Sequence, residues 1–206
     1  MFYSLERFSD GHRDLGTAVV WTDATGRYVF MIGGDRYNQT ARRRFFAAVG
    51  GQKEPGEDWF TCTEREVREE LGCAATILPA GGTWLVEADE TVTRIEVPDR
   101  PRPAILLEII RMIGSKAGST YGIAAYLSQV SGPPFHLQRD EVAGLTALPP
   151  DLLAESVRGD RTWAELLSRG AVAAAVCTGI TPDTLLYPQG TARAVGLLLS
   201  KGIRIR

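Results

Sequence analysis

The segment 50–73, GGQKEPGEDWFTCTEREVREELGC, constrains the fold of this chain more than any other stretch. It begins with two turn-forming pairs, Gly50-Gly51 and Pro55-Gly56. Glycine adopts backbone conformations closed to other residues, and proline fixes the first bend of many turns. The segment therefore predicts a loop that turns sharply and brings its main chain close to a ligand.

A helix of about thirteen residues is predicted directly after this loop, because no glycine or proline interrupts the chain before Gly72. Asp58 is suited to cap the first turn, and Gly72 is suited to the left-handed conformation that ends many helices. At about 100° per residue, apolar side chains fall in one stripe and three carboxylates lie on the opposite side. The predicted buried stripe is Phe60, Val67 and Leu71. The predicted acidic face is Glu66, Glu69 and Glu70.

Three carboxylates on adjacent helical turns repel one another, at about 0.2–0.5 kcal/mol for each like-charge pair. A divalent cation would compensate them. Mg²⁺ takes few protein carboxylates and completes its shell with water and substrate phosphates, so the pattern predicts phosphate chemistry with Mg²⁺, or with Mn²⁺ as the alternative ion. Arg65, next to this face, is placed to pair with Glu57 and hold the loop against the helix.

From Gly51 onward the segment resembles the signature of the Nudix hydrolase family. That signature is a glycine, five residues, a glutamate, seven residues, Arg-Glu, a bulky aliphatic, any residue, Glu-Glu, any residue, a glycine and a bulky aliphatic. This chain meets every charged and glycine position, and Cys73 replaces the last aliphatic residue. Cysteine packs like a small hydrophobic residue, so this departure concerns local packing. A solvated acidic face with an ordinary Glu64–Arg68 pair is the simpler interpretation, but it leaves the loop spacing unexplained.

The resemblance implies an α/β fold, a Nudix-type α/β/α sandwich with a mixed central sheet. It also implies a metal-dependent hydrolase that cleaves a phosphoanhydride bond in a nucleoside diphosphate linked to another moiety. The partner is then a small-molecule nucleotide. The alternative is a non-catalytic module of the same fold that binds a nucleotide, although such modules usually lose signature carboxylates.

The resemblance also implies roles for individual residues. The implied catalytic residues are Glu57, Arg65, Glu66, Glu69 and Glu70. The implied metal ligands are Glu66, Glu69, Glu70 and the main-chain carbonyl of Gly50 or Gly51. The general base is either Glu66 or a carboxylate from another loop, for which Asp140 and Glu141 are the candidates.

Substrate-binding residues are predicted from charge. The triplet 42–44 precedes the loop, and guanidinium groups match phosphate oxygens in pairs, so Arg43 and Arg44 are candidates together with Glu141. Family members that cleave ADP-ribose or dinucleoside polyphosphates carry a proline or a tyrosine beyond the signature. Neither stands at 88–91, so the sequence does not select a substrate.

Length and composition exclude several other classes. A chain of 206 residues with a hydrophobic share of 44% permits one core with an appendage. With 23 basic and 25 acidic residues it has no general basic surface, so nucleic acid is not an expected partner. The N-terminus lacks a targeting pattern and no apolar run approaches about 18 residues, so we expect a soluble cytoplasmic protein without a membrane partner. The three cysteines lack metal-like spacing and are expected to be reduced.

Strands are predicted on both sides of the signature. Residues 17–22 and 27–32 read as a hairpin joined by the turn DATG, and residues 45–49 as a buried strand that leads into the loop. The stretch 104–112 is ambiguous between strand and helix, and the flanking prolines and glycine favour a strand. The other predicted strands are 74–78, 83–87, 91–97, 121–130 and 141–148.

The character of the sequence becomes helical after Pro149. The segment DRTWAELLSRG contains the capping-box pattern Thr162-x-x-Glu165, and residues 190–202 are amphipathic. We therefore divide the chain into a core, 1–150, and a helical C-terminal extension, 151–206. The extension either packs on the same domain or serves as a dimerisation element that forms a homodimer.

Overall fold

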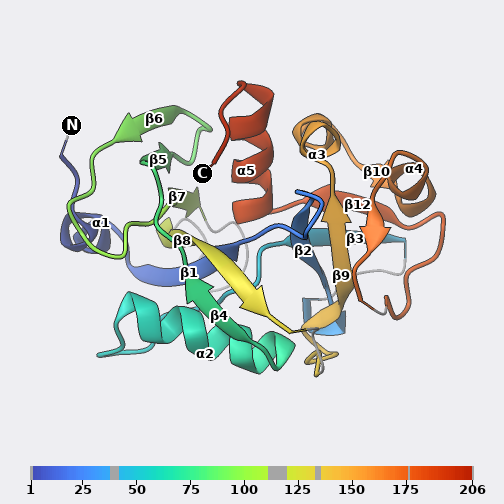
Figure 1. The fold of residues 1–206 in the computed structure, drawn as a ribbon, viewed down its shortest axis with the longest axis horizontal. Helices are drawn as coiled ribbons and strands as arrows, with labels where there is room; N and C mark the ends of the chain where they lie inside the picture. Colours follow the sequence, from blue (N-terminus) through green and yellow to red (C-terminus); the bar gives the residue numbers. More distant parts are fainter. Residues whose placement is uncertain (1, 38–41, 111–119, 133–135, 176, 206) are drawn as a thin grey trace.

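The computed structural model describes residues 2–37, 42–110, 120–132, 136–175 and 177–205. In this part of the chain, two six-stranded mixed sheets lie side by side with helices above and below them (Figure 1). The strands of the first sheet are β1 (Asp14–Val20), β4 (Ala74–Ile77), β5 (Thr83–Val86), β6 (Val92–Ile95), β7 (Ile105–Ile110) and β8 (Thr120–Ser131). The strands of the second are β2 (Tyr28–Gly33), β3 (Arg43–Ala47), β9 (Val142–Leu148), β10 (Arg161–Thr162), β11 (Val172–Ala173) and β12 (Leu185–Pro188).

The first sheet has the order β1-β8-β7-β5-β6, and β4 pairs with a further part of the long strand β8. The second sheet has the order β10-β12-β3-β2-β9-β11. The helices are α1 (Leu5–Asp10), α2 (Trp59–Leu71), α3 (Pro150–Ser156), α4 (Trp163–Ser168) and α5 (Thr191–Ser200), with a short 3-10 turn η1 (Asp35–Tyr37). Helix α2 lies below the strands, and α3 and α5 lie above them (Figure 1). This layering confirms the predicted α/β class with mixed sheets.

The predicted hairpin between residues 17–22 and 27–32 forms next to its turn, where Thr22 pairs antiparallel with Tyr28 and Val29 N donates to Trp21 O at 3.1 Å, but its strands separate beyond that point. Asp23 N donates to Arg27 O at 2.9 Å and Gly26 N to Asp23 O at 3.0 Å, so the turn forms. Strand β1 pairs in parallel with β8 over its whole length, whereas β2 pairs with β3 and β9 in the other sheet. Both strands find long ladders elsewhere, and these outcompete the local partner. The favoured strand at 104–112 is confirmed as β7 over residues 105–110, and residues 111 and 112 lie outside the described part of the chain.

The stripe predicted on α2 is right for Val67 and Leu71, which are fully buried. It is wrong for Phe60, which is 40% exposed. Cys62 and Thr63 make the first contacts with the sheet instead, and the Thr63 hydroxyl hydrogen-bonds the Thr17 hydroxyl of β1. Periodicity placed Phe60 in the buried stripe, but in the first turns of α2 the buried residues are Cys62 and Thr63.

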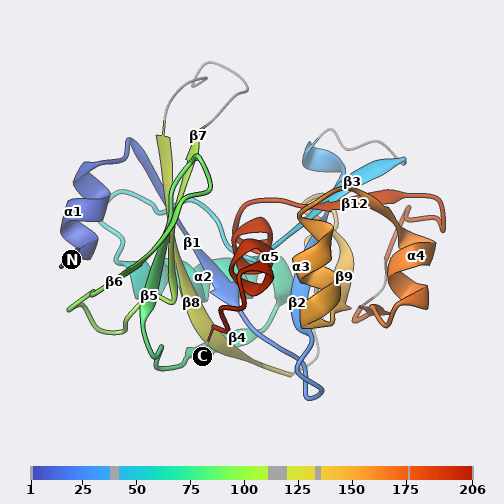
Figure 2. The ribbon, with the colours of Figure 1, turned by 90° about the horizontal axis from the view of Figure 1, so that it is seen from above.

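The C-terminal segment contains the predicted helices α3, α4 and α5, and the capping box of α4 is present. It also supplies strands: β12 pairs in parallel with β3, and β11 pairs antiparallel with β9. Figure 2 shows α5 between the first sheet and α3. Buried residues of α5 belong to one hydrophobic cluster with residues of this sheet and of α3. The division at residue 150 stays a prediction, and the segment beyond it completes the second sheet.

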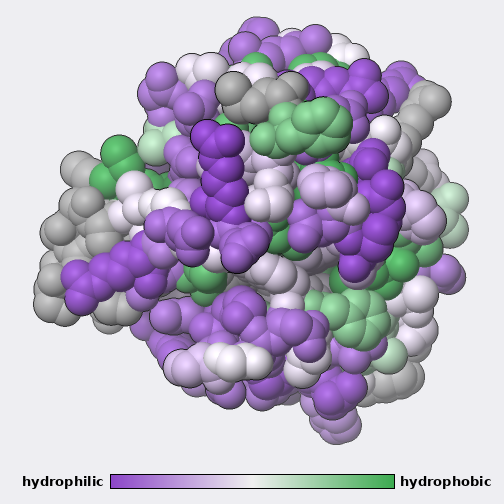
Figure 3. Space-filling view, turned by 90° about the vertical axis from the view of Figure 1, so that its left-hand side faces the viewer, coloured by the Kyte–Doolittle hydropathy of each residue, from purple (hydrophilic) through white to green (hydrophobic). Residues whose placement is uncertain are grey.

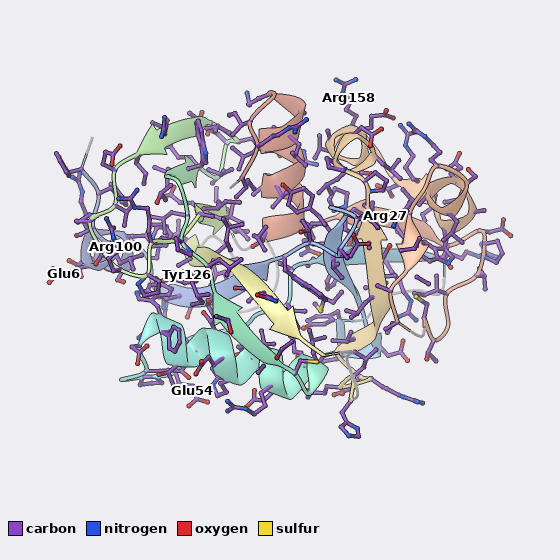
Figure 4. All side chains as sticks on the ribbon, viewed as in Figure 1. Glu6, Arg27, Glu54, Arg100, Tyr126 and Arg158 are labelled. Atoms are coloured by element: carbon purple, nitrogen blue, oxygen red, sulfur yellow. The ribbon has the colours of Figure 1, made fainter. Side chains whose placement is uncertain are left out.

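Polar side chains cover most of the face that carries α1 and β6, with apolar groups scattered among them (Figure 3). Tyr126 of β8 is 1% exposed and lies inside the molecule above α2 (Figure 4). Among the described residues, no helix is long and apolar enough to cross a membrane. Cys62 and Cys73 are buried and Cys177 is partly buried, and none of the three is joined in a disulfide.

Candidate active site

The signature helix α2 begins and ends at the predicted residues. The Asp58 carboxylate accepts hydrogen bonds from the N–H groups of Phe60 and Thr61 at 2.8 and 2.9 Å. Gly72 adopts the left-handed conformation with φ 66°. These caps satisfy groups that every helix leaves free at its ends, which is why the boundaries are readable from local sequence.

Arg65 holds the loop against the helix, as predicted. Its Nε and Nη2 donate to the two carboxylate oxygens of Glu57 at 2.9 and 3.0 Å. Its Nη2 also donates to the main-chain carbonyl of Gln52 at 3.1 Å. Nη1 donates to Glu66 at 2.8 Å and to Glu69 at 3.1 Å. The guanidinium lowers the pKa of Glu57 to about 2, because a paired charge favours the ionised carboxylate. Arg65 thus connects the loop, through Glu57 and the Gln52 carbonyl, to Glu66 and Glu69 of the helix.

The rest of the loop is exposed beside the helix. Glu54 lies at the outer surface near α2 (Figure 4), and its N–H donates to Glu57 at 2.9 Å. This second donor further stabilises the Glu57 carboxylate. Two groups therefore hold the loop through the Glu57 carboxylate: the Arg65 guanidinium from the helix and the Glu54 N–H from the loop itself.

The acidic face is buried to a large extent, which corrects the expectation of three exposed carboxylates. Glu66 is 9% exposed and Glu70 is 2% exposed. The Glu69 side chain, at 53% exposed, faces solvent. The reason is the loop, which returns over the helix: a Cβ at Gly51 would lie 2.4 Å from the Glu66 carboxylate carbon. The N–H of Gly50 reaches Glu70 at 3.4 Å.

Burial shifts the pKa of these two carboxyls. Burial and, after it, the neighbouring charge of Glu66 together raise the pKa of Glu70 to about 8. Burial also raises the pKa of Glu66, against the lowering effect of Arg65. A carboxylate removed from water is destabilised unless a cation compensates it. The pair is therefore an acidic site that a positive charge would stabilise.

The donor set fits a hard divalent ion in its chemistry. Carboxylate oxygens of Glu66, Glu69 and Glu70, with a carbonyl of the glycine pair, are the ligands that Mg²⁺ prefers. The Gly51 carbonyl also accepts a hydrogen bond from Thr17 N at 3.0 Å. Within the described residues, no three His, Cys, Asp or Glu side chains converge in a metal-binding arrangement. Binding of an ion therefore requires the carboxylates to turn away from Arg65 towards one point.

A second group of polar residues comes from the 3-10 turn η1 and the loop before β9. Glu141, a predicted candidate, is ion-paired with Arg36 and accepts hydrogen bonds from Gln138 at 3.1 Å and from the Tyr37 hydroxyl at 3.4 Å. The negative charge of Glu70 contributes to the raised pKa of Tyr37, so the two side chains are within electrostatic range. Gln138 N also donates to the Glu70 carbonyl at 3.2 Å. The structure thus brings Glu141 to the carboxylate site.

Sequence reasoning missed Tyr37 and Gln138. Tyr37 lies in the stretch GGDRYNQT, which the sequence presents as an unstructured loop, and no motif marks it. Asp140, the other acidic candidate, is exposed, and its main-chain carbonyl accepts a hydrogen bond from Arg36 N at 2.8 Å. A tyrosine in an acidic site is recognisable only once the fold has brought η1 and β9 together.

The two predicted arginines are placed away from the carboxylates. Arg43 lies 4.1 Å from the ring centre of Tyr187 and pairs with Asp160 at 2.6 Å. Arg44 is buried and donates to Gly33 O and to Asp35, both at 2.9 Å. Neither residue is among the described residues that line the cavity next to the loop. Their substrate role stays a prediction, and the contacts they make here are within the protein.

A cavity of about 740 Å³ opens beside the signature loop, in the size range of about 300–1,000 Å³ typical of ligand sites. Gly50, Gly51 and Tyr37 are among the residues that line it. The rest of the lining comes from both sheets and from the segment that contains β12 and α5. The buried carboxylates and a ligand-sized cavity therefore share one loop.

No family model matches this chain, and no curated protein matches it. Similar solved structures include the ORF135 protein of E. coli, with 18% identity, 71% of this chain and 81% of that chain covered, and a TM-score of 0.46. A MutT Nudix hydrolase from Burkholderia pseudomallei has 19% identity, covers 67% and 84% of the two chains, and has a TM-score of 0.44. An ADP-ribose pyrophosphatase from Streptococcus suis has 12% identity, coverage of 92% and 91%, and a TM-score of 0.42. These likenesses concern the fold alone.

Proposed function

We propose that this protein is a Nudix-type hydrolase that uses Mg²⁺ or Mn²⁺ to cleave a phosphoanhydride bond in a nucleoside diphosphate linked to another moiety. The observation that carries the proposal is the pair of buried carboxylates, Glu66 and Glu70, held under the Gly50-Gly51 loop beside a ligand-sized cavity. A buried carboxylate destabilises a fold unless a positive charge compensates it. Arg65 pairs with Glu66, whereas the raised pKa of Glu70 reflects burial that is not fully compensated. The presence of the two carboxylates is explained if they bind a cation in the working protein.

Each residue then has a defined part in the reaction. Glu66, Glu69 and Glu70, with the Gly50 carbonyl, would hold the ion, which when bound neutralises phosphoryl oxygens and acidifies water. Arg65 keeps the loop closed through Glu57, which fixes the positions of the glycine main-chain groups.

Two carboxylates are suited to accept the proton of the attacking water. Glu66 is one, and its contact with Arg65 lowers its pKa against the raising effect of burial. Glu141 is the other, because Tyr37 and Gln138 hold its two oxygens, and Gln138 N also donates to the main-chain carbonyl of Glu70. A base must reach the water within hydrogen-bonding distance, so replacement of each carboxylate by its amide distinguishes them. Replacement of the true base should lower turnover while the affinity for the substrate is kept.

The proposal is tested with a substrate panel in Mg²⁺ and in Mn²⁺: nucleoside diphosphate sugars, ADP-ribose, dinucleoside polyphosphates and nucleoside triphosphates. We expect at least one to release a nucleoside monophosphate, and Glu69→Gln to lower that turnover by orders of magnitude while the thermal stability is kept. Nucleotide binding without any product in either metal would establish the non-catalytic binding module instead.

A further inference from the structure

Most of the cavity lining lies outside the signature, and one wall comes from the C-terminal segment. Helix α5 forms this wall, opposite the strands of the first sheet. A Cβ at Gly190, the N-cap of α5, would lie 3.8 Å from Ile109 Cδ1 of β7, so the helix starts close to the sheet. The apolar side chains of the two walls are Ile109, Tyr121 and Ile123 from the sheet, and Ala194 and Leu197 from α5. The space between them continues to the Gly50-Gly51 loop.

The lining of the cavity is predominantly apolar, and its charged members among the described residues are Glu87, Glu90, Glu108 and Arg193. Glu108 of β7 lies beside Gly122 of β8, on the face of the sheet where its carboxylate is 3.4 Å from His12 Nε2. Arg193 is the one cationic side chain among the described residues that line the cavity. It is neutralised by Glu90 at 2.5 Å, at the rim.

Tyr121 connects this cavity to the signature loop. A Cβ at Gly16 of β1 would lie 2.0 Å from the Tyr121 hydroxyl and 2.6 Å from the Gly51 carbonyl oxygen. The Tyr121 side chain therefore lies across Gly16 of β1, where no side chain blocks it, and its hydroxyl ends beside the Gly51 carbonyl. A group that lies against the Tyr121 ring is thus next to the phosphate end of the site.

We propose that this cavity is the subsite for the nucleobase of the substrate, and that Leu197 of α5 sets the size of base it accepts. The inference rests on the proposed function, because the loop end must hold the diphosphate. A flat heterocycle gains about 25 cal/mol per Å² of apolar surface buried between such walls. A hexose buried here would leave hydroxyls without partners, at about 1–3 kcal/mol each. The polar rim offers Gln189 and Arg193 to the edge of a base.

Leu197 is the residue of this wall best suited to control size. It is partly buried and packs at the edge of the main core, whereas Ala194 is fully enclosed. The helix itself is held in place, since a Cβ at Gly196 would lie 2.8 Å from the Leu153 carbonyl of α3. A larger side chain at 197 must therefore occupy the cavity, because the backbone of α5 has no room to retreat.

The test compares one purine and one pyrimidine substrate that share the same second moiety, ADP-glucose and UDP-glucose, and measures kcat/KM for each. Leu197→Trp is expected to lower the purine-to-pyrimidine ratio about tenfold, the scale of discrimination by pocket size, and to act through KM. Leu197→Ala should raise the ratio. Ser200→Trp, which introduces the same side chain on the exposed end of α5, should leave it unchanged. An unchanged ratio in both folded Leu197 variants overturns the inference.

Equilibrium binding of AMP and UMP gives a readout independent of hydrolysis. We expect Leu197→Trp to weaken AMP binding about tenfold and UMP binding less, the scale set by pocket size. If the monophosphates bind in this way and no nucleotide is cleaved, the subsite is supported and the hydrolase proposal fails. If nucleotides are cleaved and AMP binding is unaffected by either Leu197 variant, the hydrolase proposal is supported and the subsite is refuted.

Discussion

Replacing Glu70 by glutamine should stabilise the metal-free protein while it removes activity. Glu70 is 2% exposed, and its pKa is raised from 4.5 to about 8 by burial and by Glu66. At pH 7 the folded protein must keep this carboxyl protonated, whereas the unfolded chain releases the proton. This difference costs about 3 kcal/mol. Glutamine has the same shape and carries no charge, so it removes the cost.

The net gain is smaller, because the buried amide also needs hydrogen-bond partners. We expect the free energy of unfolding to rise by about 1–2 kcal/mol, after a loss of about 1–2 kcal/mol for imperfectly paired amide groups. For a chain of this size, that corresponds to an increase in Tm of roughly 2–8 °C. The assay is thermal unfolding in EDTA, followed by circular dichroism, for wild type and for Glu70→Gln.

The pH dependence of the stability difference between Glu70→Gln and wild type is a second test of this prediction. A carboxyl whose folded pKa is raised binds protons more tightly in the folded state, so its penalty is absent below about pH 4.5, grows with rising pH and levels off above about 8. The advantage of Glu70→Gln should therefore widen between pH 5 and pH 8. Glu69→Gln is the matched control: its side chain is 53% exposed, and we expect a change within about 0.5 kcal/mol. A Glu70→Gln protein that is less stable than wild type, with no pH trend, would refute the argument.

Three further predictions concern the loop and the ion. Glu57→Gln should lower the free energy of unfolding by about 1–2 kcal/mol at pH 7, because the ion pair with Arg65 is lost. The wild type loses this stabilisation as the pH falls from 4.5 to about 2, so the stability of the variant should depend less on pH in that range. Urea unfolding at pH 3 and 6 measures both effects. Gly51→Ala should displace the Glu66 carboxylate and lower kcat at least about tenfold with Tm nearly kept, whereas Gly159→Ala, where a Cβ meets nothing, should be neutral. The rise in Tm caused by Mg²⁺ should grow from pH 6 to pH 8, because the ion must displace the Glu70 proton.

Local sequence was sufficient to predict the signature helix and the residues at which it begins and ends. The cap at Asp58 and the left-handed Gly72 depend on neighbouring residues only, and both are where the pattern places them. The pair between Arg65 and Glu57 was predictable for the same reason, since a loop of fixed length limits what the guanidinium can reach. The strands were predictable in position, because alternation and turn residues are also local. Their pairing depended on long β8, which offers ladders to β1, β4 and β7.

The burial of Glu66 and Glu70 was not predictable from helical periodicity. A helical wheel gives the direction of a side chain, but it does not show what lies over that face. Here the cover is the glycine pair: a Cβ at Gly50 would lie 2.1 Å from the Thr17 carbonyl of β1, and one at Gly51 would meet Glu66. The loop can press onto both the strand and the carboxylate only because neither position carries a side chain. The same residues that made the loop recognisable therefore change the electrostatics of the helix beneath it.

The nucleobase subsite illustrates why specificity is harder to predict than chemistry. Its walls come from β7, β8 and α5, which are separated along the chain and meet only through the sheet order and the packing of α5 on α3. Ile109, Tyr121 and Leu197 are ordinary core residues by pattern, and nothing in their local sequence distinguishes a wall from a filled interior. The carboxylates must repeat at helical spacing to work together, whereas a wall needs only an apolar surface at the right distance. A change at Leu197 can therefore alter the substrate while the signature segment stays the same.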